Sequence, residues 1–426
     1  MPFRIRTLTV FVCLLFLSFA SAKEINQNLL ERENMYWDFR TQLATKAITS
    51  LSKINFFSPA VKEIFIDALW DALDEAQENN YPQFANYFSA ISNGESLENW
   101  PLSSQLRLRF LQALHLHQKI SRDFLLKMLV EIKNIRLTSQ EATLLFSLIS
   151  DPRDSLGMEK LKAPLYLAYP QEGVIFDQSI SAAIPSEAEI RQIFNHLPDM
   201  TSYRQGEYQQ VLRFYVFCRR NRDFPCLILM RNGQGELVLD EQGQIWHQPA
   251  LAASSKGLPS HIRNGQTPTG VQTIDSVMPE ANRQDAFGKF RRLILNWIPK
   301  VEDEELTNYL LPPESKTSDW WKGALVSRDA GRVDLRIHGT GRLNDDPSST
   351  YYPHRKTSGC ISQREGTYAE IEYVDQRKIL DTSMQALGLG TSFENEVQIK
   401  GILYLIEIND QENAVSFDQL KSILDI

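Results

Sequence analysis

The sequence predicts an α+β fold in which an N-terminal all-α helical module precedes a β-rich domain. Up to about residue 200, apolar residues recur at the spacing of amphipathic helices. Beyond about residue 210, short runs of β-branched and aromatic residues alternate with turn signals. The chain has 426 residues, 42% of them hydrophobic, which is enough for two or three ordinary cores. We therefore divide it into residues 1–22, a helical module at 23–205, a β-rich domain at 206–409 and a helical tail at 410–426.

Residues 1–22 have the features of a secretory signal peptide. Arg4 and Arg6 precede an apolar run from Leu8 to Phe19, and Ala20-Ser21-Ala22 offers the small side chains that a signal peptidase requires. A membrane anchor is the alternative, but the apolar run falls short of the roughly 20 residues that span a bilayer as a helix. We expect cleavage after Ala22 and an exported mature protein without a membrane span, with the periplasm as its compartment.

The helical module contains two sequence signals for helix starts. Thr138 is followed by Glu141, and Ser186 by Glu189, which is the spacing of a capping box. The apolar stripes of this module predict helix-on-helix packing rather than a ligand groove.

The β-rich domain is predicted from short apolar runs separated by turn signals such as Asn232-Gly233 and Gln242-Gly243. A short amphipathic helix is expected at the end of the chain, from Ser416 to Ile426. The predicted strands are Val211–Phe217, Cys226–Met230, Glu236–Leu239, Ile245–Trp246, Val271–Ile274, Arg292–Ile298, Val333–His338 and Ile402–Ile408.

Charge and cysteine content narrow the function classes. The formal net charge of −8 argues against a nucleic-acid partner, because binding to a polyanion needs a basic surface. Four cysteines are too few for a disulfide scaffold. Cys218 and Cys226 bracket a polar loop between two predicted strands, and the sequence leaves open whether they form a disulfide or remain two buried thiols.

Cys360 and His338 are the candidates for chemistry. His338-Gly339 ends a predicted strand, which places the imidazole at a strand edge, and Cys360 follows a glycine at the start of another element. A thiol becomes a nucleophile when a neighbouring base takes its proton, so a Cys and a His are a sufficient pair. Without their flanking residues, a buried structural cysteine would be the commoner outcome for such a pair.

The flanking residues resemble the signature of the L,D-transpeptidase (YkuD-like) family. That signature places His-Gly on a strand and Ser/Thr-x-Gly-Cys after it, and it reads here as His338-Gly339 and Thr357-Ser358-Gly359-Cys360. A second family motif, Thr-Pro-x-Gly, is present earlier as Thr267-Pro268-Thr269-Gly270. The resemblance covers roughly Phe224 to Asn409. It departs from the family at the longer loop before Cys360 and at Ser362, where many members have Arg.

The resemblance implies a peptidoglycan L,D-transpeptidase that needs no metal and no cofactor. Cys360 would form an acyl-enzyme with a tetrapeptide stem, His338 would act as acid and base, and the N–H groups of Gly359 and Cys360 would bind the oxyanion. The acceptor would be a diaminopimelate amine or a wall-attached protein, whereas water would make the enzyme an L,D-carboxypeptidase. A catalytically weak peptidoglycan-binding protein is the remaining alternative. Further substrate-binding candidates are Gly339, Thr357, Ser358, Arg364 and His354, the last of which is alternatively a solvated loop residue.

Overall fold

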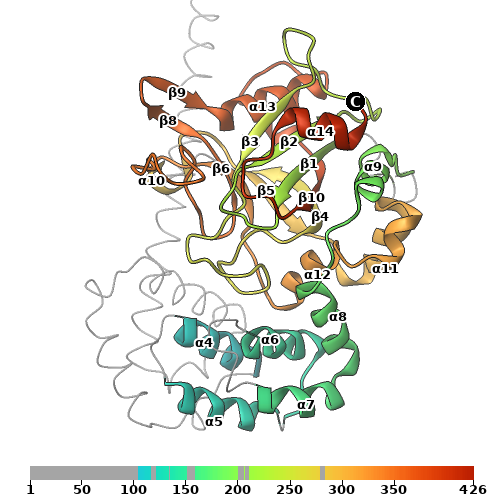
Figure 1. Cartoon of the computed structure of the whole chain (residues 1–426), viewed down its shortest axis with the longest axis vertical. Coiled ribbons are helices and arrows are strands. Elements are labelled where there is room, and N and C mark those ends of the chain that lie inside the picture. Colours follow the sequence, from blue (N-terminus) through green and yellow to red (C-terminus); the bar gives the residue numbers. More distant parts are fainter. Residues whose placement is uncertain are drawn as a thin grey trace, which may run out of the picture. The chain divides into compact units, whose positions relative to one another are not determined.

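The computed structural model describes residues 104–116, 121–133, 135–150, 159–199, 206, 211–278 and 284–426. The predicted signal peptide at 1–22 and residues 23–103 of the predicted helical module lie outside the described residues. The chain forms two compact units, 1–125 and 126–426, and Figure 1 shows that the second unit combines helices with a large sheet. The predicted mixture of helices and strands is therefore confirmed.

Every regular element described before residue 200 is a helix. No helix within the described ranges is long and apolar enough to cross a membrane. The helices before residue 200 are α4 (Ser104–Leu116), α5 (Arg122–Lys133), α6 (Ser139–Ile149), α7 (Glu159–Ala168), α8 (Pro170–Ile180) and α9 (Glu187–Asn195).

Of the two predicted capping boxes, one is complete. At α6, the Thr138 hydroxyl accepts from the Glu141 N–H at 3.2 Å, and the Glu141 carboxylate accepts from the Thr138 N–H at 2.7 Å. At α9, Ser186 accepts from the Glu189 N–H at 3.2 Å. The Glu189 carboxylate instead accepts hydrogen bonds from the hydroxyls of Ser315, in the 3₁₀ segment Pro313–Thr317, and of Ser318, which follows it. Tertiary contacts therefore replace the second hydrogen bond of this capping box.

The large sheet has eight strands in the order β3-β2-β1-β10-β4-β5-β6-β7. β1 is parallel to β10 and β6 is parallel to β7, while the other neighbours are antiparallel. Just after β3, Leu251 exchanges backbone hydrogen bonds of 3.0 and 2.8 Å with Ser362 of β7, so the sheet is nearly closed. The strands are β1 (Leu212–Arg219), β2 (Cys226–Arg231), β3 (His247–Ala250), β4 (Gly270–Val277), β5 (Leu293–Trp297), β6 (Arg336–Gly339), β7 (Ile361–Gln363) and β10 (Gly401–Asn409).

Two predicted strands are wrong. Residues 236–239 and 245–246 form only the isolated bridges Arg231↔Leu237 and Leu239↔Ile245. Tight turns at 232–235 and 240–243 leave too few residues between them for a ladder. Several elements lack a prediction, namely α10 (Gln284–Phe287), α12 (Lys322–Asp329), β8 (Glu365–Tyr368), β9 (Ile371–Val374) and α13 (Asp375–Ala386).

Both faces of the sheet are covered by apolar side chains. On one face, Phe214, Ile337 and Ile361 pack in a cluster with the apolar side of α13. On the other face, the rings of Tyr215 and Tyr404 stack with centroids 5.1 Å apart and pack against α9 and α14 (Phe417–Leu424). Figure 1 shows α9 and α14 side by side near the chain's C-terminus. The predicted terminal helix is thus confirmed as part of this core.

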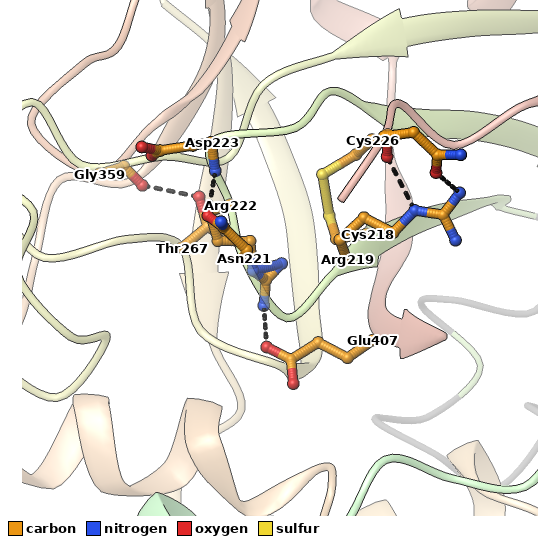
Figure 2. Close-up of a disulfide and its surroundings, with 10 residues drawn as sticks. Cys218, Arg219, Asn221, Arg222, Asp223, Cys226, Thr267, Gly359 and Glu407 are labelled. Carbon is orange, nitrogen blue, oxygen red and sulfur yellow. Dashed lines mark hydrogen bonds and ion pairs between the residues drawn. A yellow bond between two sulfur atoms is a disulfide. The ribbon is translucent and has the colours of Figure 1, made fainter. Parts of the chain in front are cut away.

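A disulfide joins Cys218 on β1 to Cys226 on β2, as Figure 2 shows, so these residues are not free thiols. The hairpin loop that it closes contacts the segment before Cys360. Lys356 forms an ion pair with Asp223 at 2.7 Å, and the Thr350 hydroxyl donates to the Asp223 carbonyl at 2.6 Å. The disulfide-bonded hairpin therefore braces the long loop between β6 and β7.

Candidate active site

The parallel pair β6–β7 places His338 and Cys360 on one face of the sheet. Ile337 is paired with Ile361, and both side chains belong to the apolar core. Because side chains alternate along a strand, the adjacent His338 and Cys360 point to the opposite face. His338 is the ladder partner of Ser362, two residues after Cys360. The two candidate residues are therefore diagonal neighbours, with Cα atoms on the order of 8 Å apart.

The His338 imidazole is held in one protonation state. The ring is buried, and its Nδ1 lies 2.5 Å from the carbonyl oxygen of Gly339, which can only accept, so Nδ1 carries the proton. Burial lowers the pKa of His338 to about 3; Arg336 and Arg292 act in the same direction, and the hydrogen bond to Gly339 opposes them. The ring is therefore neutral with an unprotonated Nε2, which is the state a general base needs.

Cys360 is also neutral in the resting site. The residue is 7% exposed, and its thiol donates to the carbonyl oxygen of Asp334 at 3.6 Å. Burial raises the pKa of the thiol, while the charges of Arg336 and, less strongly, Arg332 act in the opposite direction. In a resting thiolate–imidazolium pair, the attraction between the ions would have to offset the free-energy cost of desolvating both. The thiol of Cys360 therefore keeps its proton in the resting site.

A tight turn precedes the nucleophile. Gly359 has a φ of 105°, and a Cβ at this position would clash with the carbonyl oxygen of Gly265. The Thr267 hydroxyl donates to the Gly359 carbonyl at 2.8 Å, as Figure 2 shows, and the Thr357 hydroxyl donates to the Cys360 carbonyl at 2.7 Å. Residues from both sequence motifs thus meet next to Cys360. The use of the Gly359 and Cys360 N–H groups as an oxyanion hole stays a prediction.

Gly339 packs against a buried carboxylate. A Cβ at Gly339 would clash with Glu365, which is 2% exposed and accepts from the N–H of Lys289. Burial raises the pKa of Glu365. Phe287, two residues before Lys289, contacts the His338 ring edge-on with centroids 5.3 Å apart. Glu365 therefore links the segment that covers the imidazole to the strand that carries it.

The other three predicted substrate-binding candidates have different surroundings. Arg364 forms an ion pair with Asp375 at 2.5 Å and lies over the Tyr373 ring at 4.4 Å, which ties it to β9 and α13. His354 is 2% exposed, so the alternative of a solvated loop residue is wrong. Ser358 is exposed.

Several contributors to the site carry no local sequence signal. Arg332, Phe287 and Glu365 reach it through tertiary contacts from three different segments. Within the described ranges, no group of three or more His, Cys, Asp or Glu side chains is placed to hold a metal ion. No protein-family model, curated protein or solved structure matches this chain.

We expect the buried histidines to make the stability of the fold depend on pH. Burial lowers the pKa of His354 to about 3, as it does for His338. An unfolded histidine binds a proton near pH 6.5, so between pH 6.5 and 3 the unfolded chain holds more protons and the free energy of unfolding falls with falling pH. Each histidine contributes at most about 1.4 kcal/mol per pH unit. His354→Gln should remove one contribution, measured by urea unfolding at several pH values in this window.

The exposed His247 on β3 supplies the matched control. His247→Gln is the same exchange at an exposed position, where no buried imidazole is lost. A His354→Gln slope equal to that of the wild type would contradict the burial of a neutral His354.

Proposed function

We propose that this protein is a peptidoglycan L,D-transpeptidase of the cysteine type, with residues 206–409 as its catalytic domain. The observation that carries the proposal is the register of β6–β7, which makes His338, whose Nε2 carries no proton, a diagonal neighbour of Cys360. The Thr267 hydroxyl, from the Thr-Pro-x-Gly motif, supports it by bracing the glycine before the nucleophile.

In the first half of the proposed reaction, the stem peptide is transferred to the enzyme. The Cys360 thiol gives its proton to His338 Nε2 as sulfur attacks the carbonyl carbon that diaminopimelate contributes to its bond with the terminal D-alanine. The new C–S bond forms a tetrahedral oxyanion, which collapses with cleavage of the C–N bond. His338 returns the proton to the departing D-alanine amine, leaving a thioester on Cys360.

In the second half, the acceptor takes the stem peptide from the thioester. An amine of a second diaminopimelate, or of a wall-attached protein, attacks the thioester carbon and gives a proton to His338. The C–S bond breaks, and the thiolate of Cys360 recovers its proton from His338. Water in place of the amine yields a tripeptide, which is the carboxypeptidase outcome. Both outcomes use the same acyl-enzyme.

Arg336 is the cation that we propose for a carboxylate of the stem peptide. It directly precedes Ile337, the ladder partner of Ile361, and its charge acts on the Cys360 thiol. Its ion pair with Asp334, at 3.2 Å, involves a carboxylate that is 55% exposed. Because the Asp334 carboxylate is largely solvated, exchanging it for a substrate carboxylate costs little free energy. Arg364, engaged by buried Asp375, is less suited to this role.

The disulfide supports the periplasm as the compartment of this proposed activity. Disulfides persist in oxidising compartments and are rare where thiols are kept reduced. The Cys218–Cys226 bridge agrees with the secretory signal expected at 1–22.

The proposed function is tested with purified diaminopimelate tetrapeptides and the mass of their products. We expect D-alanine release with either a cross-linked dimer or a tripeptide, and the ratio of these products distinguishes the transpeptidase from the carboxypeptidase. Adding a second stem as acceptor should raise the yield of dimer if transfer is the main reaction. Unchanged tetrapeptide, in the presence of folded protein, would contradict both activities and favour a peptidoglycan-binding protein.

A further inference from the structure

Arg332 is a buried arginine beside the turn at Gly359, in the loop between α12 and β6. It is 3% exposed. Its guanidinium donates to the backbone carbonyl oxygens of Ser260 at 2.5 Å, Gln266 at 2.7 Å and Gly265 at 2.9 Å. Among the described residues, no Asp or Glu pairs with it or acts on it electrostatically. Its positive charge is therefore met by neutral carbonyl dipoles.

The same contacts connect Arg332 to Gly359. A Cβ on Gly359 would lie 2.5 Å from the Nη2 atom of Arg332 and would clash with the carbonyl oxygen of Gly265, to which Nη2 donates. Thr267, two residues after Gly265, holds the Gly359 carbonyl at 2.8 Å. Residues 260–267 and the turn at Gly359 thus form one hydrogen-bonded unit around the guanidinium.

Negative charge at Cys360 stabilises the charged form of Arg332. Burial lowers the pKa of Arg332 to about 10, and its interaction with Cys360 acts in the opposite direction. A buried cation without an acidic partner gains most from a nearby anion, because the local dielectric constant is low. The proposed reaction creates such an anion twice, on the sulfur of Cys360 and on the oxygen of the tetrahedral intermediate.

We propose that Arg332 is a positioning residue, which fixes the Gly359 turn and holds a buried positive charge against the ionised form of Cys360. This inference rests on the nucleophilic role of Cys360 in the proposed function, but not on the identity of the substrate. Two other charged groups act on the thiol, Arg336 and Asp334, and Arg263 acts on Arg332 itself. All three remain unchanged in the experiment.

The test is the rate of Cys360 alkylation by iodoacetamide as a function of pH, in the full chain carrying Cys13→Ser. Cys218 and Cys226 are bridged, so Cys360 is then the free thiol that reacts. Alkylation requires the thiolate, so the profile reports ionisation without a peptide substrate. Arg332→Gln keeps a donor for the carbonyls and removes the charge. We expect its alkylation rate on the rising part of the profile to be about three- to tenfold lower, with the midpoint at higher pH.

Arg332→Lys retains the charge and should keep the midpoint of the wild type. Arg219→Gln is the matched control, because Arg219 is also buried, 1% exposed, and donates to neutral acceptors such as the Asn413 carbonyl and the Gln419 side chain. It anchors the C-terminal tail, so its loss should lower stability without moving the profile.

Either of two results would overturn the proposal. One is an unshifted profile in folded Arg332→Gln, and the other is a midpoint in Arg332→Lys that moves to higher pH. The two variants are independent, so the test remains decisive if one of them does not fold. A shifted profile in Arg332→Gln together with no tetrapeptide turnover in the wild type would remove the proposed function and leave the role of Arg332 in place.

Discussion

Replacing Cys360 by Ala will reduce turnover of a diaminopimelate tetrapeptide below detection, because alanine has no atom that can form the acyl-enzyme. Replacing His338 by Gln will lower turnover by about 10²- to 10⁴-fold, since the amide occupies similar space but cannot take the thiol proton. Intact-protein mass after exposure to a carbapenem provides a second readout. The wild type should gain one covalent adduct, and Cys360→Ala should gain none.

The double variant Cys218→Ala, Cys226→Ala is the control for the nucleophile. It removes the disulfide and leaves Cys360, so it should still form the adduct, with a lower free energy of unfolding. Turnover at the wild-type rate in Cys360→Ala or His338→Gln would refute the site assignment. A wild-type thiol that stays unmodified after long incubation would favour the peptidoglycan-binding alternative.

His338 and Cys360 could be selected as candidates from the sequence because their signals are local. His338-Gly339 and Gly359-Cys360 are short motifs whose glycines have steric reasons visible in the structure, namely Glu365 beside one and Gly265 beside the other. Arg332 had no such signal. Its importance depends on three carbonyls from residues 260–266, which only the folded chain brings to it. Long-range hydrogen bonds to backbone carbonyls leave no pattern in a single sequence.

The same distinction applies to the fold. β1 and β10 are long, mostly apolar strands buried in the sheet, and the sequence predicted them. β3 reads His-Gln-Pro-Ala and is a strand because β2 supplies its ladder partners, not because of its own propensity. β7 is likewise short and half polar. Both edge strands contribute to the site. The backbone of Leu251, just after β3, is hydrogen-bonded to Ser362 of β7, and Ser362 is the ladder partner of His338.

Substitution of Gly359 by Ala should change the geometry of the turn before Cys360 while leaving the Cys360 thiol and the His338 imidazole in place. A φ of 105° is strained for alanine, and the new Cβ would meet the Gly265 carbonyl and the Arg332 guanidinium, both of which are fixed by hydrogen bonds. We expect the free energy of unfolding to fall by about 3 kcal/mol. Displacement of the Cys360 backbone by about 1 Å should lower turnover by roughly 10²-fold, although the thiol and imidazole are intact.

Gly243 offers the matched control for this prediction. It also has a positive φ, 74°, but nothing lies within 4 Å of the position that a Cβ would occupy. Gly243→Ala therefore carries the backbone penalty without the clash, and should cost about 1–2 kcal/mol with turnover unchanged. Urea unfolding and tetrapeptide turnover of the two variants measure the difference. Equal losses of stability in both variants would mean that the turn at Gly359 yields to a methyl group, and the close contact between Gly265, Arg332 and Gly359 would then not be what positions Cys360.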